Sequence, residues 1–281
     1  MDPYILTASN IDIIHGFTTR DGEPGLTPLQ SMNLSMSRAA DPNHVVNTFF
    51  SLGGKMGFDP YKLVLANQTH STTIGVCTAE DHMGFDSRNY PECDALITRD
   101  PGTALCVFTA DCAPILLWDT VLGAVGAVHA GWRGTVSKLV CRTIRAMEKH
   151  YGSYPRDIHA AIGPSIGPCC FETDEDVPNA LLRAFGPAAA PYIRRDSSGK
   201  YHPDLKGLNV LALSQIGVPS IEVLPDCTKC KPQLYFSHRA YTQGEGPRQE
   251  GRQGAIIVCY STEYQLCEET YKKRHRRVIY R

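Results

Sequence analysis

Several patterns that mark common protein classes are missing from this sequence of 281 residues. No apolar run reaches the roughly 18 residues that a membrane-spanning helix requires. The N-terminus also lacks the basic start and apolar stretch of a secretory signal. The formal net charge is only −1, so no overall basic field is present to attract nucleic acid. We therefore expect a cytoplasmic protein that contacts neither membranes nor nucleic acid.

Familiar catalytic motifs are missing as well. The sequence has neither a G-x-x-x-x-G-K-[ST] phosphate loop nor the H-E-x-x-H zinc motif of metalloproteases. It also lacks the H-x-E and P-C-x-x-C motifs of nucleobase deaminases. Cys227 begins a C-x-x-C, but the residue directly before it is Asp226, and Pro225 lies one position too early. None of the ten histidines forms an H-x-H pair, the arrangement with which multicopper oxidases hold their clusters. These absences argue against each of those classes.

Cysteine, in contrast, is abundant, with eleven residues. Without a secretory signal these thiols are expected to stay reduced, as core residues or metal ligands. Cys227 and Cys230 form a C-x-x-C, which can be a redox pair or half of a zinc site. No second C-x-x-C accompanies it, so we expect structural cysteines there. The adjacent Cys169 and Cys170 are expected to pack in the core.

The order of the expected elements favours an α+β fold. Hydrophobic residues make up 42% of the chain, enough for a sizeable core. Strands outnumber helices and follow each other too closely for strict βαβ alternation, which favours one layered domain of mixed sheets flanked by helices. We expect a single catalytic domain over residues 1–264 and a solvated basic tail over 265–281. The expected strands cover 11–18, 62–68, 73–77, 94–98, 104–112, 114–119, 122–131, 157–162, 192–194, 221–224 and 255–259, and the expected helices begin near 42, 134, 173 and 205. The strands at 62–68 and 73–77 are expected to pair.

The stretch from Thr109 to Thr135 carries two candidate metal ligands, each at the end of an apolar run. Cys112 precedes one buried strand, and His129 ends the next. If these strands lie side by side, Cys112 and His129 come close together. A third candidate ligand, His70, follows the earlier strand expected at 62–68. A Cys and two His offer the thiolate and nitrogen donors that zinc prefers, and three protein ligands leave one position open, as in catalytic sites. The spacing also allows a buried Cys and two ordinary His.

Two further features within this stretch suggest supporting roles. Asp111 could orient a ligand or a bound water, or simply cap the end of a strand. Gly131-Trp132-Arg133-Gly134 lies just before an expected helix, where backbone N–H groups and the Arg133 side chain could bind a phosphate. A tight turn with a solvent-facing Arg is the alternative.

Taken together, the motifs resemble the YfiH/YlmD-like family, whose members carry the labels polyphenol oxidase laccase domain, peptidoglycan editing factor and purine nucleoside phosphorylase. The resemblance covers nearly the whole chain. It rests on the segments N-Q-T-H-S at 67–71, D-A-L-I-T at 94–98, T-A-D-C-A-P at 109–114, H-A-G-W-R-G at 129–134, I-G-P-S-I-G at 162–167, and F-S-H-R at 236–239 with G-R at 251–252. The segment at 236–239 departs from the family pattern, which often has Tyr where His238 stands.

The resemblance implies a zinc ion, with copper as a possible substitute, held by His70, Cys112 and His129. It implies phosphorolysis of adenosine, inosine, guanosine or methylthioadenosine, and deamination of adenosine. As for assembly, we expect a monomer or a homodimer. For phosphate, Arg20, Arg133 and Arg252 are the candidate ligands. Three alternatives stay open: a copper-dependent polyphenol oxidase, an amidase that edits a peptidoglycan precursor, and a zinc-stabilised interaction module without catalysis.

Overall fold

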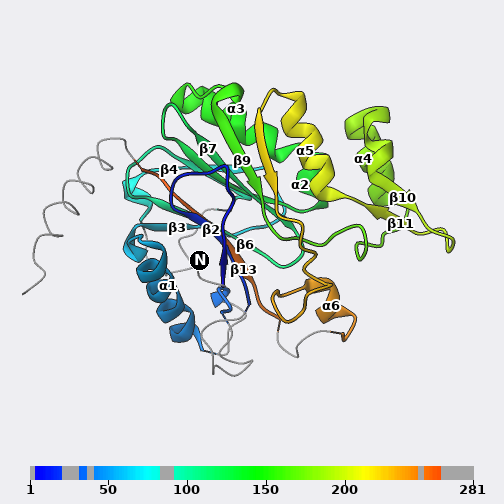
Figure 1. Ribbon diagram of the computed structural model, residues 1–281, viewed down its shortest axis with the longest axis horizontal. Coiled ribbons are helices and arrows are strands. Elements are labelled where there is room, and N and C mark those ends of the chain that lie inside the picture. Colours follow the sequence, from blue (N-terminus) through cyan, green and yellow to red (C-terminus); the bar gives the residue numbers. More distant parts are fainter. Residues whose placement is uncertain (1–3, 21–31, 37–40, 83–91, 246–249, 261–281) are drawn as a thin grey trace, which may run out of the picture.

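Two stacked β-sheets form the centre of the molecule in the computed structural model (Figure 1). The structure describes residues 4–20, 32–36, 41–82, 92–245 and 250–260. The predicted basic tail at 265–281 lies outside these ranges.

The first sheet has five strands in the order β1-β2-β13-β6-β3. Its β3 runs parallel to β6, while its other pairs are antiparallel. The strands are β1 (Ile5–Leu6), β2 (His15–Thr18), β3 (Leu63–Leu65), β6 (Ala104–Thr109) and β13 (Gln253–Val258).

The second sheet has six strands in the order β12-β9-β7-β8-β5-β4 and is also mixed. Its strands are β4 (Ile74–Cys77), β5 (Ala95–Thr98), β7 (Ala113–Asp119), β8 (Val125–Ala130), β9 (Ile158–Ile162) and β12 (Ser220–Val223). A small separate hairpin joins β10 (Ile193–Arg195) to β11 (Tyr201–Pro203).

Helices cover the two outer faces, so the domain has four layers (Figure 1). The helices are α1 (Pro42–Met56), α2 (Trp132–Val136), α3 (Leu139–Tyr151), α4 (Asp176–Phe185), α5 (Leu205–Gln215) and α6 (His238–Thr242). Alternating side chains on each strand serve different cores: Leu105 and Leu116 lie between the sheets, Cys106 packs beneath α1 with Phe49, and Ile115 packs with α3, α4 and α5. This period of two is the normal consequence of strand geometry.

The α+β prediction is confirmed, and so are most of the expected elements. The helix expected at 42 begins with Asp41 as N-cap, whose side chain accepts a hydrogen bond from the backbone N–H of Asn43. The helix expected from 134 is interrupted at Lys138, which adopts a left-handed φ of 52° before α3 begins. The polar stretch at 237–254 contains the short helix α6, and residues 246–249 lie outside the described ranges.

One predicted strand pairing is wrong. Strand β4 does not pair with β3, because the chain leaves the first sheet after Leu65 and joins the second sheet, where β4 runs beside β5. The expected hairpin of the two buried strands is correct, since β7 and β8 are antiparallel, with Pro114 opposite His129.

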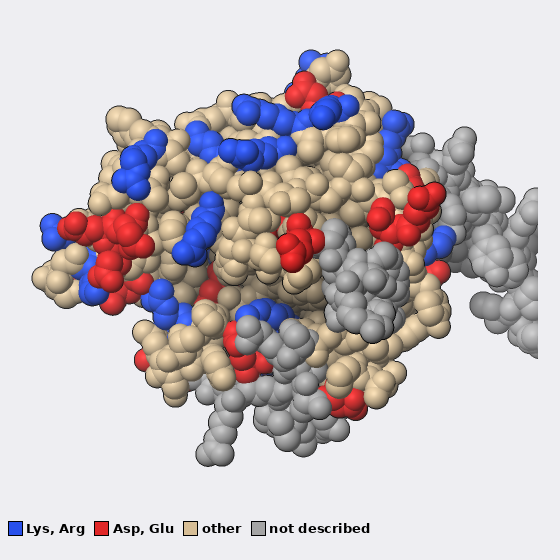
Figure 2. Space-filling view, turned by 180° about the vertical axis from the view of Figure 1, so that it is seen from behind, with Lys and Arg blue, Asp and Glu red and all other residues tan. Residues whose placement is uncertain are grey.

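Charged side chains form small groups of both signs on the surface. On the face in Figure 2, Lys and Arg gather along the upper edge, at the level where α3 lies in Figure 1, and Asp and Glu gather at the left edge. Within the described ranges, none of the helices combines the length and apolar character needed to cross a bilayer.

Candidate metal centre

Two of the three candidate ligands lie where the chain passes from one sheet to the other. His70 belongs to the connection from β3 to β4, and Cys112 to the connection from β6 to β7. Both crossings need tight backbone turns: His70 has a φ of 57° and Asp111, next to Cys112, has a φ of 87°. A positive φ is strained for residues with a side chain, and such strain tends to persist at functional sites.

The third candidate, His129, is buried on β8, and the hairpin register sets it beside the start of β7. The Sγ atom of Cys112 lies 3.8 Å from Nε2 of His70. One potential ligand atom from each of His70, Cys112 and His129 lies within 4.8 Å of the other two. The structure thus brings together the three residues, here called the triad, that the sequence had singled out.

The carboxylate of Asp94, which the sequence interpretation had not proposed as a site residue, contacts two of the three residues of the triad. Asp94, directly before β5, accepts a hydrogen bond at Oδ1 from Nδ1 of His129 at 2.8 Å. The backbone N–H groups of His70 and Ser71 also donate to this carboxylate. Such a contact fixes the imidazole tautomer and leaves Nε2 for a metal. The signal was present in the sequence, as an Asp directly before a buried strand.

The electrostatics of the triad favour an ionised thiol. Burial raises the pKa of Cys112, but the charge and hydrogen bonds of His129 and His70 outweigh it and lower the pKa from 9.0 to about 6. Burial lowers the pKa of His129, but Cys112 and Asp94 raise it overall. Burial likewise raises the pKa of Asp94, while hydrogen bonds from His129 and Ser71 bring it down to about 2. In the absence of a metal these shifts favour a thiolate beside a protonated His129, so a metal that binds here must displace the proton from His129.

The backbone at Gly131 makes room for the triad. A Cβ atom at this position would lie 2.9 Å from Sγ of Cys112 and 3.2 Å from Cδ2 of His70. Its φ of −67° needs no glycine, so the close approach of the two side chains is what requires one. The donor set and this space fit a zinc ion with three protein ligands.

Asp111 does not contact the triad histidines through its carboxylate. Its Oδ1 accepts a hydrogen bond from the hydroxyl of Thr228 at 2.6 Å, and its Oδ2 accepts one from the backbone N–H of Arg239 at 2.7 Å. The carboxylate that contacts a triad histidine is that of Asp94, and the carboxylate of Asp111 ties the segment before Cys112 to two later segments.

The three candidate arginines occupy different environments. Arg133 is exposed on α2, and its guanidinium stacks 4.2 Å from the centroid of the Trp132 ring. Arg252 forms an ion pair with Glu250 at 2.8 Å. Arg20 donates to the carbonyl of Pro232 at 2.8 Å and stacks over Phe236. Because α2 has only five residues, the charge of Arg133 matters more for an anion than a helix dipole does.

The same region contains a G-x-S-x-G pattern, from Gly163 to Gly167. In hydrolases this pattern exposes a nucleophilic Ser on a sharp strand-to-helix turn. Here Ser165 is 1% exposed and forms a β-bridge with Cys227. Among the described residues its hydroxyl has no hydrogen-bond partner, so no general base is in place to activate it.

Comparison with known proteins shows the family to which this chain is similar. Residues 14–260 match the family described as multi-copper polyphenol oxidoreductase laccase. A purine nucleoside phosphorylase of Bacteroides thetaiotaomicron is 36% identical over 242 residues, which are 84% of this chain and 89% of that protein. Adenosine deaminase RL5, from an unknown prokaryotic organism, is 32% identical over 83% of this chain and 90% of its own length.

A solved structure extends the similarity to the fold. The crystal structure of YlmD from Geobacillus stearothermophilus superimposes with a TM-score of 0.79 at 34% identity, covering 88% of this chain and 92% of that one. With its two mixed sheets, its triad and these matches, the chain belongs to the YfiH/YlmD family of laccase-like domains.

Proposed function

We propose that this chain is a zinc-dependent purine nucleoside phosphorylase that also deaminates adenosine. The observation that carries the proposal is the convergence of His70, Cys112 and His129. Support comes from relatives named purine nucleoside phosphorylase and adenosine deaminase. The proposed substrates are adenosine, inosine, guanosine and methylthioadenosine, together with phosphate.

The residues of the triad would hold the metal, with Cys112 as the thiolate and two imidazole nitrogens. When bound, zinc supplies a Lewis acid and lowers the pKa of a bound water towards neutrality. Asp94 keeps His129 in the tautomer that binds metal. The ten described cysteines are all free, which supports a reducing, cytoplasm-like compartment.

Phosphorolysis makes its own demands on the chain. A phosphate oxygen forms a bond to C1′ while the bond from C1′ to the base breaks, and the bond electrons leave with the base, which then takes a proton. The phosphate dianion must be held near C1′ as positive charge develops on the sugar. Arg133 is the best placed of the three arginines to do this, because it is exposed beside the triad-lining Gly131 and its guanidinium keeps its donors free of any ion pair among the described residues.

The decisive experiment separates this function from its rivals. Metal-analysed protein is incubated with adenosine, with and without phosphate, and the products are resolved by chromatography. Adenine and ribose 1-phosphate in the presence of phosphate, and inosine without it, are expected. A Cys112→Ala variant should lose both activities, and a Cys141→Ala variant, altered outside the triad, should keep them. Absence of turnover of any purine by the zinc-loaded protein would overturn the proposal and favour the amidase or the interaction module.

A further inference from the structure

Four cysteines outside the triad meet at the surface between two loops. Cys169 and Cys170 lie between β9 and α4, and Cys227 and Cys230 follow β12. The four Sγ atoms all lie within 4.8 Å of one another. Cys230 is 3.5 Å from Cys169 and 3.3 Å from Cys170, measured between sulfur atoms. The prediction that Cys169 and Cys170 pack in the core is therefore wrong, since Cys169 is exposed and Cys170 only partly buried.

These separations suit metal ligands better than a disulfide. A disulfide needs its sulfur atoms about 2.05 Å apart, and all four cysteines are free. Four thiolates around one zinc, with bonds of about 2.3 Å, place the sulfur atoms about 3.8 Å apart in a tetrahedron. We propose that Cys169, Cys170, Cys227 and Cys230, here called the four-cysteine cluster, bind one zinc ion as a closed structural site in addition to the triad.

The two loops are joined to each other by backbone contacts at the cluster. Ser165 and Cys227 form a parallel β-bridge, and the N–H of Thr228 donates to the carbonyl of Ser165 at 3.1 Å. The N–H of Gly167 donates to Sγ of Cys227 at 3.2 Å. A backbone donor to a ligand sulfur is the kind of outer contact that fixes metal ligands. The sulfur atoms are therefore positioned by the fold and not only by chance proximity.

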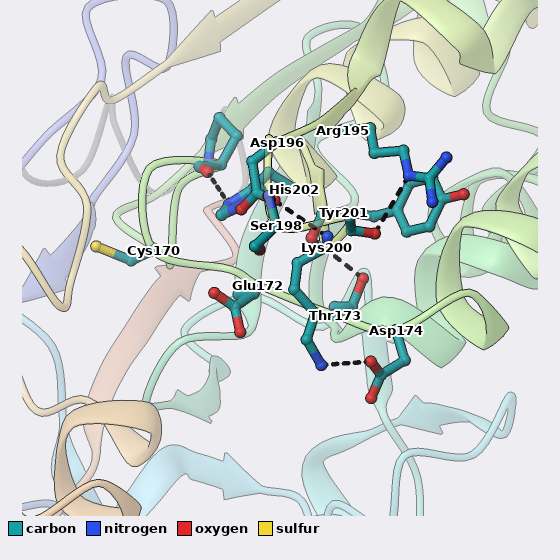
Figure 3. Close-up of polar contacts among 12 residues, drawn as sticks. Cys170, Glu172, Thr173, Asp174, Arg195, Asp196, Ser198, Lys200, Tyr201 and His202 are labelled. Atoms are coloured by element: carbon teal, nitrogen blue, oxygen red, sulfur yellow. Dashed lines mark hydrogen bonds and ion pairs between the residues drawn. The ribbon is translucent and has the colours of Figure 1, made fainter.

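The loop between β9 and α4, which carries Cys169 and Cys170, is anchored by the β10–β11 hairpin, as Figure 3 shows. Nδ1 of His202 lies 3.0 Å from the carbonyl oxygen of Pro168, and Nε2 lies 2.8 Å from Asp196. In the same figure the Cys170 side chain points away from these hairpin residues. Both nitrogens of His202 are thus already engaged, which argues against a metal on the nearby Glu172, Asp196 and His202 and leaves the cysteines as the ligands in this region.

A buried cation lies against the cluster. Lys206 on α5 is only 8% exposed and donates to the carbonyls of Leu224 and Asp226. It lines one cleft together with Cys169 and Cys227. Four thiolates around a divalent ion carry a net charge of about −2, and a neighbouring ammonium offsets part of it. A negative cluster also gives this buried Lys a reason to remain charged.

The four-cysteine cluster also connects to the triad. Thr228 lies between the two ligands of the C-x-x-C and is the donor that contacts Asp111, the residue before Cys112. On the other loop, the N–H of Ile166 donates to the carbonyl of Asp111 at 2.9 Å. Zinc in the cluster would hold both loops and, through them, the strained backbone at Asp111.

The test counts zinc and identifies its ligands in the full-length protein. After dialysis against metal-free buffer, elemental analysis is expected to find about two zinc ions per wild-type chain. A His70→Ala/Cys112→Ala double variant should keep one, Cys230→Ser should keep one, and Cys141→Ala, at a buried cysteine outside both sites, should keep two. X-ray absorption of the double variant should show sulfur at about 2.3 Å and no nitrogen around zinc.

This design does not depend on the Cys230→Ser variant folding, because the double variant leaves the four-cysteine cluster intact. Nor does it depend on activity, so it stands apart from the proposed function. Absence of zinc in the folded double variant would overturn the proposal. Nitrogen ligands around its zinc would do the same, as would a disulfide among the four cysteines found by mass spectrometry of protein purified without reductant.

Discussion

Oδ1 of Asp94 lies 2.8 Å from Nδ1 of His129, while the same carboxylate accepts the backbone N–H of His70. One side chain therefore orients two of the three residues of the triad. This explains why an acidic group is almost fully buried at this position.

Replacing Asp94 with Asn should weaken zinc binding at the triad by about 10- to 100-fold, because the histidine loses its charged orienting partner. The affinity is measured by competition with a chromophoric chelator. Asp41→Asn is the matched control, since Asn caps a helix as well as Asp does and α1 is elsewhere. An affinity equal to that of the wild type would mean that Asp94 only supports the fold.

Gly131→Ala should reduce zinc affinity while leaving the chain folded. The added methyl group meets Cys112 and His70 at distances that force one of them to move, and a displacement of this kind should lower the affinity by roughly tenfold or more. Gly54→Ala on α1 is the control, because open space surrounds its Cβ position. Chelator competition and thermal unfolding of both variants check this; equal zinc affinity in the two would refute the steric argument.

The low pKa of Asp94 predicts how stability depends on pH. Its pKa of about 2 is below the ordinary 3.8, so its contribution is fully present above pH 3.8 and is lost as the pH falls towards 2. The contribution amounts to about 2 kcal/mol. In urea unfolding of zinc-free protein, the free-energy gap between wild type and Asp94→Asn should narrow from pH 6 to pH 3. A constant gap would contradict the assignment.

Arg133→Ala should raise the phosphate KM by about 10- to 100-fold, because a charge-assisted hydrogen bond contributes roughly 1.5–3 kcal/mol. The nucleoside KM should change much less. Initial rates at varied phosphate measure both constants, and Arg142→Ala, on the exposed side of α3, serves as the control. If phosphate dependence is unchanged, Arg252 or Arg20 becomes the better candidate.

Periodic apolar patterns were sufficient to predict most strands and helices and the hairpin that carries His129. They could not predict that β4 belongs to the second sheet, because the apolar pattern of a strand does not specify which strand it pairs with. Asp94 was placed on a strand within a family segment, but its contact with His129 was not predicted, because the two residues are 35 positions apart. The environment of Cys169 and Cys170 was predicted wrongly for the same reason. Their neighbours Cys227 and Cys230 are distant in the sequence, because α4 and α5 lie between the two pairs.

The two crossings between the sheets meet beside β8. His70 and Cys112 each lie between a strand of one sheet and a strand of the other. The antiparallel register of β7 and β8 sets Cys112 beside His129, and the carboxylate of Asp94 holds the backbone of His70. A metal bound by the triad would therefore fasten both connections between the sheets to a single strand, β8.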